Sequence, residues 1–241
     1  MKEVMKNKEM CFRTAVGLII LAVSSYLVLS CPNSCLCITQ YEGVIVHCNG
    51  TGLTDIPRNI PNDAYAIHMD KNPITIIENG TFQNVTSLYT LNLYWCNIST
   101  IETNAFINLP NLQNLYLGNN SITYLHQATF KELSALIKLD LRNNRITTLQ
   151  NGIFQDNQAL QDLSLSGNNL TFVRNDTFEH NINLQFLFLD LVCDCNVAFW
   201  SWLKTLETKR YLYGVIKCLD RNGIDLSSLQ ASDFDNCDGK L

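Results

Sequence analysis

The sequence predicts an α/β solenoid of 24-residue repeats. Its concave face is a curved parallel β-sheet, its convex side is irregular or 3-10 helical, and a disulfide-bonded cap closes each end. Two observations carry this prediction. A leucine pattern recurs with a 24-residue period through the middle of the chain, and two groups of four cysteines flank it. Because one such repeat buries its apolar face only against its neighbours, a period of this length is typical of a solenoid.

The repeated pattern has the form L-x-x-L-x-L-x-x-N-x-I. Its six copies begin at Ala64, Leu88, Leu112, Leu136, Leu160 and Leu184. The period-two alternation at the centre of each copy predicts a strand, and stacked repeats align these strands in one parallel sheet. We expect the Asn at the turn to bind backbone groups of neighbouring turns, which would otherwise be buried without partners.

A second series of residues keeps the same period. Its members are Phe82, Phe106, Phe130, Phe154 and Phe178. We expect them to fill the convex half of each coil as a stacked aromatic spine. One repeat departs from the turn pattern, because Cys96 takes the Asn position. A reactive or intermolecular thiol is one interpretation of Cys96, and a buried, unpaired turn residue is the one that we favour.

The N-terminal segment, 1–30, has the features of a signal peptide. Four basic residues precede an apolar run from Ala15 to Leu29, and Val28 and Ser30 suit cleavage before Cys31. The alternative is a signal anchor that stays in the membrane. We favour cleavage, with no membrane span remaining, because the run has about 15 residues and a bilayer requires ~20.

The mature chain is acidic. Residues 1–30 hold four of the 17 basic and two of the 22 acidic residues, so 13 basic and 20 acidic residues remain, with a net charge of −7. Nucleic acids and anionic membranes require a basic face on their partner. Neither is therefore an expected partner.

Eight of the nine cysteines of the mature chain lie in two groups at its ends. They are Cys31, Cys35, Cys37 and Cys48, and then Cys193, Cys195, Cys218 and Cys237. Even sets of four in an exported chain indicate disulfides. A zinc site is the alternative, but it would need a reducing compartment and pairs of the C-x-x-C type. Each set allows three pairings, and the spacing alone does not choose among them.

Seven N-glycosylation sequons support export and predict a glycoprotein. Their asparagines are Asn49, Asn79, Asn84, Asn97, Asn119, Asn169 and Asn175. Seven in the mature chain is more than chance would give, so we expect a secreted protein of the extracellular space or matrix.

The chain resembles extracellular leucine-rich-repeat proteins with cysteine-rich N- and C-terminal caps. The N-terminal motif is Cys31-Pro32-x-x-Cys35-x-Cys37-x(10)-Cys48. The C-terminal motif is Cys193-Asp194-Cys195-x(22)-Cys218-x(18)-Cys237, with a helical stretch from Phe199 to Leu206. The compact build is similar to variable lymphocyte receptors, single Slit domains and small matrix repeat proteins. These shared motifs specify an architecture and say little about the ligand.

The resemblance implies a disulfide pairing and exposes one departure. The implied pairs are Cys31–Cys37, Cys35–Cys48, Cys193–Cys218 and Cys195–Cys237. Family spacing would place the first C-terminal cysteine at residue 196, but it stands at 193, and the sixth repeat lacks its turn Asn. Either the cap joins through a compressed turn or the sequence carries a small deletion, so the docking of this cap stays open.

These motifs divide the chain into four parts. We expect a signal peptide at 1–30, an N-terminal cap at 31–61, six 24-residue repeats at 62–190 and a C-terminal cap at 191–241. Caps are needed because the end repeats would otherwise expose their leucine edges to water, and each disulfide contributes about 2–4 kcal/mol.

The residue inventory does not indicate an enzyme. The four histidines are scattered in sequence, and no Ser/His/Asp or Cys/His set is apparent. The sequence also lacks a phosphate-binding glycine loop and a metal motif. We therefore expect no catalytic residues, no cofactor and no metal site.

Strand residues between the leucines point out of the concave sheet and form the candidate ligand-binding set. Its members are His68, Asp70, Tyr94, Trp95, Tyr116, Lys138, Asp140 and Arg142. Aromatic residues and Arg are over-represented in binding hot spots, although scattered aromatics on an ordinary sheet surface are also common. Phe186 and Phe188 are expected either to meet a ligand or to pack against the C-terminal cap.

The main functional hypothesis is a secreted, non-enzymatic recognition protein that binds a protein or glycan on its concave face, for example in innate immunity. The alternatives are an extracellular-matrix or guidance and adhesion component, and the ectodomain of a longer receptor. We expect a monomer or a weak dimer.

Overall fold

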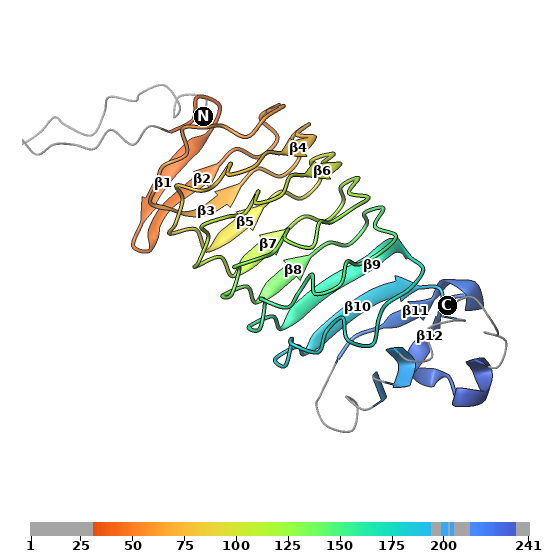
Figure 1. The fold of residues 1–241 in the computed structure, drawn as a ribbon. Helices are drawn as coiled ribbons and strands as arrows, with labels where there is room; N and C mark the ends of the chain where they lie inside the picture. Colours follow the sequence, from red (N-terminus) through yellow and green to blue (C-terminus); the bar gives the residue numbers. More distant parts are fainter. Residues whose placement is uncertain (1–30, 194–198, 202, 205–212, 235–241) are drawn as a thin grey trace, which may run out of the picture.

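The computed structural model describes residues 31–193, 199–201, 203–204 and 213–234. Within these residues, ten strands form one sheet that runs the length of the molecule (Figure 1). In sheet order they are β1 (Leu36–Gln40), β2 (Gly43–His47), β3 (Ala64–His68), β5 (Thr90–Asn92), β7 (Asn114–Tyr116), β8 (Lys138–Asp140), β9 (Asp162–Leu170), β10 (Phe186–Leu191), β11 (Ile216–Cys218) and β12 (Ile224–Asp225).

All neighbouring strands from β2 to β11 pair in parallel, and the terminal pairs β1–β2 and β11–β12 are antiparallel. The repeat strands keep a constant register, in which Leu91 lies opposite Leu115 and Leu115 lies opposite Leu139. This confirms the predicted parallel-sheet solenoid. The constant repeat length sets the register, because each coil returns to the same height beside its neighbour.

The other side of the coils is formed mainly by turns. A second, two-stranded parallel sheet lies there, made of β4 (Ile76–Ile77) and β6 (Thr100–Ile101). Among the described residues, the 3-10 helices lie after the repeats rather than within them. They are η1 (Leu219–Arg221), η2 (Leu226–Ser228) and η3 (Ala231–Phe234).

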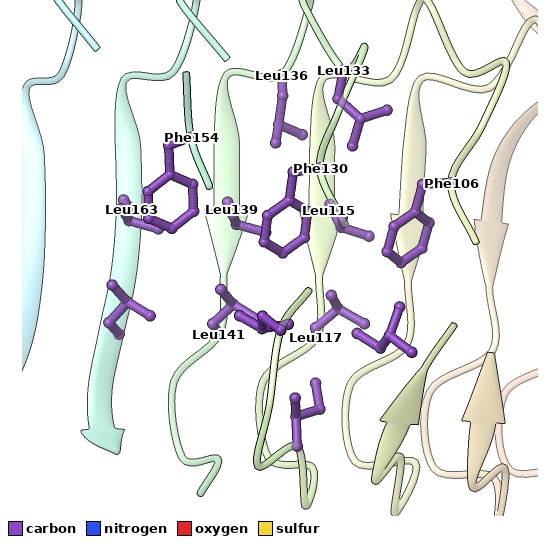
Figure 2. Packing of buried hydrophobic residues seen from close by; sticks show 14 of the residues in the cluster. Phe106, Leu115, Leu117, Phe130, Leu133, Leu136, Leu139, Leu141, Phe154 and Leu163 are labelled. Carbon is purple, nitrogen blue, oxygen red and sulfur yellow. The ribbon is translucent and has the colours of Figure 1, made fainter. Parts of the chain in front are cut away.

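The core lies between the sheet and the convex turns. The two leucines of each strand point inward, and Leu115, Leu117, Leu139 and Leu141 are fully buried. Figure 2 shows Leu115 and Leu139 beside the rings of Phe106, Phe130 and Phe154, and Leu117 and Leu141 below them in the view. Burying each such side chain contributes about 1.5–3 kcal/mol, and its packing partners come from the repeats on both sides.

The predicted aromatic spine is present. Successive rings from Phe82 to Phe178 stack with centroid distances of 5.8–6.4 Å. Phe199 extends the series by contacting Phe178 at 6.2 Å in a tilted arrangement, and it is fully buried. The C-terminal cap therefore ends the spine with a ring that lies outside the repeat period.

The turn asparagines form the expected ladder. Asn120 Nδ2 donates to the carbonyl oxygens of Leu93 and Leu117, both at 2.9 Å. Its Oδ1 accepts the backbone N–H groups of Cys96 and Ile98 at 3.0 and 2.9 Å. Asn144 and Asn168 repeat the two donations in the following coils. One buried amide thus satisfies backbone groups of two neighbouring repeats.

Cys96 has the environment that we favoured from the sequence. It is a free, fully buried cysteine. Its thiol donates to the Met69 carbonyl oxygen at 3.2 Å, and burial raises the pKa of the thiol. A raised pKa lowers the thiolate fraction, so Cys96 is a poor nucleophile.

Three disulfides join the described cysteines of the caps: Cys31–Cys37, Cys35–Cys48 and Cys193–Cys218. These are pairs that the resemblance implies. The fourth implied pair, Cys195–Cys237, lies outside the described residues. Residues 199–201 and 203–204 are helical, and Leu203 is buried; Leu206 lies outside the described part.

The shortened junction is a compressed turn. β9 is nine residues long and continues to Leu170, which pairs with Leu191 of β10 after a register shift. Asp190 Oδ2 accepts the Gly167 N–H at 2.7 Å, and Asp220 Oδ1 accepts the Cys193 N–H at 2.8 Å. The two carboxylates therefore bind backbone N–H groups of the fifth coil and of the start of the C-terminal cap, on either side of the coil that lacks a turn Asn.

The expected signal peptide at 1–30 lies outside the described residues. Within the described part of the chain, no helix combines the length and the apolar character that crossing a bilayer requires.

Candidate functional site

The candidate residues lie in two rows across the repeat strands. Strand register places His68, Asn92, Tyr116 and Asp140 side by side in one row. Two residues further along each coil, a second row contains Asp70, Tyr94, Gly118 and Arg142. The rows arise because every second strand residue points out of the sheet and every repeat has the same length.

A hollow of about 270 Å³ opens between the coils of the first three repeats. It is lined by Asp70, Lys71, Asn92, Tyr94, Trp95 and Tyr116, and we call it the aromatic hollow. Four of these residues belong to the set predicted from the sequence. Lys71 and Asn92 were not singled out, although their places in the repeat put them on the same face.

Trp95 is held in a conformation that is unfavourable for a bulky side chain. It has φ 59°, and its counterparts Lys71, Asn119, Asn143 and Gly167 also have positive φ. The repeat therefore imposes a left-handed residue at this turn, which Gly and Asn accept readily. For a non-glycine residue the left-handed region costs about 1–2 kcal/mol. Trp95 is nevertheless 58% exposed, so burial does not offset this cost.

Tyr94 and Arg142 meet across a glycine. Arg142 Cζ lies 5.6 Å from the centre of the Tyr94 ring, which is within the range of a cation–π interaction. A Cβ atom on Gly118 would lie 2.5 Å from Tyr94 Cε2 and 3.2 Å from Arg142 Cγ. Gly118 is thus required because it has no side chain, and not because of its backbone conformation. The sequence pattern alone did not identify this role.

Asp140 positions Arg142. Its side chain is 1% exposed and receives the guanidinium through Nε at 3.0 and 2.8 Å and through Nη2 at 2.5 Å. This hydrogen bonding raises the pKa of Arg142. Asp140 has almost no surface of its own, so the exposed group of this pair is Arg142, whose side chain is 48% exposed.

Lys138 is engaged by an ion pair. Its Nζ lies 2.7 Å from Asp162 Oδ2, and this bond raises the pKa of Lys138. The charged band that begins at Lys138 is therefore internally neutralised, and its charges attract a ligand less than isolated ones would.

His68 lies at the N-terminal border of the site. Its ring stacks on His47 of β2, with centroids 5.2 Å apart. Burial, and then the neighbouring His47, lower the pKa of His68, while Asp70 acts in the opposite direction. The neutral form of His68 is therefore favoured, and His68 lies in the same row as Asn92 and Tyr116, two of the residues that line the aromatic hollow.

At the C-terminal end of the concave face, Phe186 packs against the region of the C-terminal cap. Its ring stacks on Tyr213 at 5.7 Å, and both remain partly exposed, at 40% and 57%. Phe186 thus contacts the region of the cap, which is one of the two alternatives from the sequence, and it still presents apolar surface.

Six of the seven sequon asparagines are exposed: Asn49, Asn79, Asn84, Asn97, Asn169 and Asn175. Asn119 is half-buried, and its Oδ1 accepts a hydrogen bond from Asn143 Nδ2 at 3.0 Å. Glycans on the six exposed residues would be accommodated without disturbing the core.

A second hollow, of about 220 Å³, lies on the convex turns of the third and fourth repeats. Among its lining residues are His126, Lys131, Gln155 and Asp156, and aromatic rings other than His126 are not part of it. The aromatic hollow is therefore the better candidate for ligand recognition.

The chain has recognisable relatives. The model of the family described as Leucine rich repeat matches four overlapping segments, 65–122, 86–146, 110–170 and 134–190, which together span residues 65–190. Leucine-rich repeat-containing protein 3 of Mus musculus is 42% identical over 64 residues, which is 27% of this chain and 25% of that protein.

Two further relatives are similar over segments of about the same length. Leucine-rich repeat-containing protein 3B of Homo sapiens is 38% identical over 63 residues, or 26% of this chain and 24% of that protein. Asporin of Bos taurus is 38% identical over 64 residues, or 27% and 16%. The chain spans about a quarter of the length of the first relatives that it matches. Since the family model covers more than half of the chain and the repeats form the expected parallel sheet, the chain belongs to the leucine-rich repeat family.

Proposed function

We propose that this chain is a secreted recognition protein that binds a protein or glycan ligand with its concave face, in a role such as innate immune recognition. Proteins of its family typically bind other proteins and are not enzymes. The disulfides support an oxidising compartment such as the extracellular space. The signal peptide and the glycosylation of the sequons are part of this proposal.

The aromatic hollow is the observation that carries the proposal. Trp95 is exposed at a left-handed position, and strained residues of this kind cluster at binding sites. Tyr94 and Arg142 are fixed in advance by Gly118 and Asp140. A site whose side chains are already ordered loses less conformational entropy when a ligand binds.

The test is a binding screen with the secreted, glycosylated chain against a panel of glycosylated extracellular proteins. We expect Trp95→Ala and Tyr116→Ala to weaken binding of the captured protein by at least about tenfold, the scale of a hot-spot residue. Gly118→Ala should weaken it as well, because the new Cβ displaces the Tyr94 ring.

Tyr124→Ala is the matched control, since Tyr124 is 52% exposed and lies outside the aromatic hollow. Binding that Trp95→Ala, Tyr116→Ala and Gly118→Ala all leave unchanged would exclude the concave face as the binding surface.

A second candidate is a matrix, guidance or adhesion component that self-associates. The edge strand β1 favours it, because β1 contains no charged residue and exposes Leu36 and Ile38 at 61% and 40%. An open, uncharged edge is a template for pairing with another strand. A concentration-dependent dimer in analytical ultracentrifugation, lost in Ile38→Lys, supports this candidate. A monomer at all concentrations contradicts it.

A third candidate, the ectodomain of a longer receptor, is supported by the length of the relatives, of which this chain spans about a quarter. Sequencing of full-length transcripts tests it, since an open reading frame that continues into a membrane-spanning segment is expected.

A further inference from the structure

The aromatic hollow contains polar groups without partners in the described part of the chain. Asp70 Oδ1 accepts hydrogen bonds from the side-chain amides of Asn49 and Asn92, whereas its Oδ2 has none. Lys71 makes no ion pair there, and the Tyr116 hydroxyl and the Trp95 indole N–H make no hydrogen bond. One acceptor, two donors and one group of both kinds are therefore free to meet a ligand.

The charges in and beside the aromatic hollow oppose an ionic ligand of either sign. A cationic group would approach Asp70 but would also meet Lys71, and the guanidinium of Arg142 lies over the Tyr94 ring. An anionic group would approach Lys71 but would meet the free oxygen of Asp70. Because a carboxylate and an ammonium group share the same small space, their fields largely cancel, and a neutral polar ligand fits best.

The aromatic rings add a second requirement. Trp95 and Tyr116 offer apolar faces beside these polar groups. A ligand that fills the space must therefore have one apolar face and several groups that both donate and accept hydrogen bonds. A pyranose ring meets both conditions, since C–H groups cover its faces and hydroxyl groups lie around its edge.

The volume limits the size of the ligand. Sites for drug-sized molecules are about 300–1,000 Å³, and the aromatic hollow has about 270 Å³ and is open to solvent. It accommodates one sugar ring, and the remainder of an oligosaccharide would extend along the concave face.

We propose that the aromatic hollow binds one neutral pyranose residue of a glycan. Trp95 and Tyr116 stack on the ring, Asp70 Oδ2 accepts from its hydroxyl groups, and Lys71 and the Trp95 indole N–H donate to them. This assignment rests on the proposed concave-face function and names the chemical class of its ligand.

The experiment is an array of immobilised oligosaccharides that end in galactose, mannose, N-acetylglucosamine or sialic acid, probed with the secreted chain. We expect binding to one or more of the neutral termini and weaker binding where sialic acid covers the same terminus. Trp95→Ala and Asp70→Ala should each reduce that signal by about tenfold. Tyr124→Ala, the control outside the aromatic hollow, should retain it.

A captured extracellular protein separates this proposal from the broader one. If enzymatic removal of its glycans abolishes binding, the sugar assignment is supported. If the deglycosylated protein still binds and Trp95→Ala weakens that binding, the concave-face function holds and the sugar assignment fails. An array without signal, or a signal that Trp95→Ala leaves unchanged, overturns the sugar assignment as well.

Discussion

The interior repeats and the two ends of the solenoid complete their backbone hydrogen bonding in different ways. In the interior, Asn120, Asn144 and Asn168 bind carbonyl oxygens of two adjacent coils. At the C-terminal end, where the sixth coil lacks this Asn, Asp190 and Asp220 accept the backbone N–H groups of Gly167 and Cys193. At the N-terminal end, Asn72 still donates to the carbonyl oxygens of Met69 and Cys48, and an antiparallel hairpin and two disulfides complete the sheet.

This difference indicates that the sequence period constrains the contact residues mainly where a coil has another repeat on both sides. An interior coil repeats the same contacts above and below, so one residue type recurs at one place, with Cys96 of the second coil as the exception. An end coil meets a repeat on one side and a cap on the other, so its contacts with the cap need not follow the period. Substitutions at matched interior and end positions measure how far this holds.

The largest expected effect is on the aromatic spine. Phe130→Ala should lower the free energy of unfolding by about 3–5 kcal/mol, because a fully buried ring between two others leaves a cavity. Phe199→Ala should cost less, since Phe199 contacts one spine ring at the end of the series. Urea unfolding followed by circular dichroism, with the disulfides intact, measures both. Equal losses would contradict the comparison.

The next largest effect on stability concerns the ladder of turn asparagines. Asn144→Ala should destabilise by about 2–3 kcal/mol, because buried backbone groups of two coils lose their partners. Asp190→Ala at the junction should cost less than about 1 kcal/mol, since the Gly167 N–H that it frees can bind water. The same unfolding assay applies. A junction variant as destabilised as the interior one would show that the end is equally constrained.

Cys96→Asn should stabilise the protein, by about 1 kcal/mol. At this place in the next three repeats, an amide oxygen accepts backbone N–H groups, two at Asn120 and one each at Asn144 and Asn168, whereas the Cys96 thiol donates to Met69. Restoring the amide extends the ladder by one coil. Cys96→Ala is the control for removing the thiol, and we expect it to be destabilising. A loss of stability in Cys96→Asn would show that the second coil has adapted its packing to sulfur.

The smallest effect is a pH dependence at the N-terminal end. The pKa of His68 in the fold lies below its usual value, so its neutral form is favoured there. Its contribution to stability is complete above about pH 6.5 and is lost as the pH falls through the lowered pKa. The urea midpoint should therefore fall between pH 7 and pH 5, and His68→Asn should reduce this fall.

His126→Asn, which replaces an exposed histidine on the convex turns, is the control for this pH effect. It should keep the same pH dependence as the unaltered chain. If His126→Asn and His68→Asn change the profile equally, the effect belongs to net charge rather than to the stacked histidines.

Sequence reasoning predicted the regular part of the fold because the repeats share one residue pattern. The leucines, the spine from Phe82 to Phe178 and the turn Asn ladder follow from one period. Sequence reasoning did not single out two further buried asparagines, Asn157 and Asn181. Their Nδ2 groups donate to carbonyl oxygens of the convex turns, such as Phe130 O and Phe154 O. The available signal was that the two asparagines stand one repeat apart, at a place where Leu133 stands one repeat earlier.

The candidate site was predicted less completely. The period placed Tyr94, Trp95 and Tyr116 on one face, and the aromatic hollow contains all three. Side-chain partners were not predictable, since Asp140 could have faced a ligand as well as Arg142. The role of Gly118 depends on the approach of two side chains from the coils on either side.

By itself, the sequence determined the period, and with it the parallel sheet, the inward leucines and the face on which the variable residues lie. The tertiary structure alone decided which groups are free. It pairs the charges of Lys138 and Arg142 with carboxylates of the sheet and leaves Asp70 Oδ2 and the Trp95 side chain free to meet a ligand. It also joins the last coil through a compressed turn. The physical reason is that burial patterns are local and periodic, whereas ion pairs and close contacts depend on distances between coils.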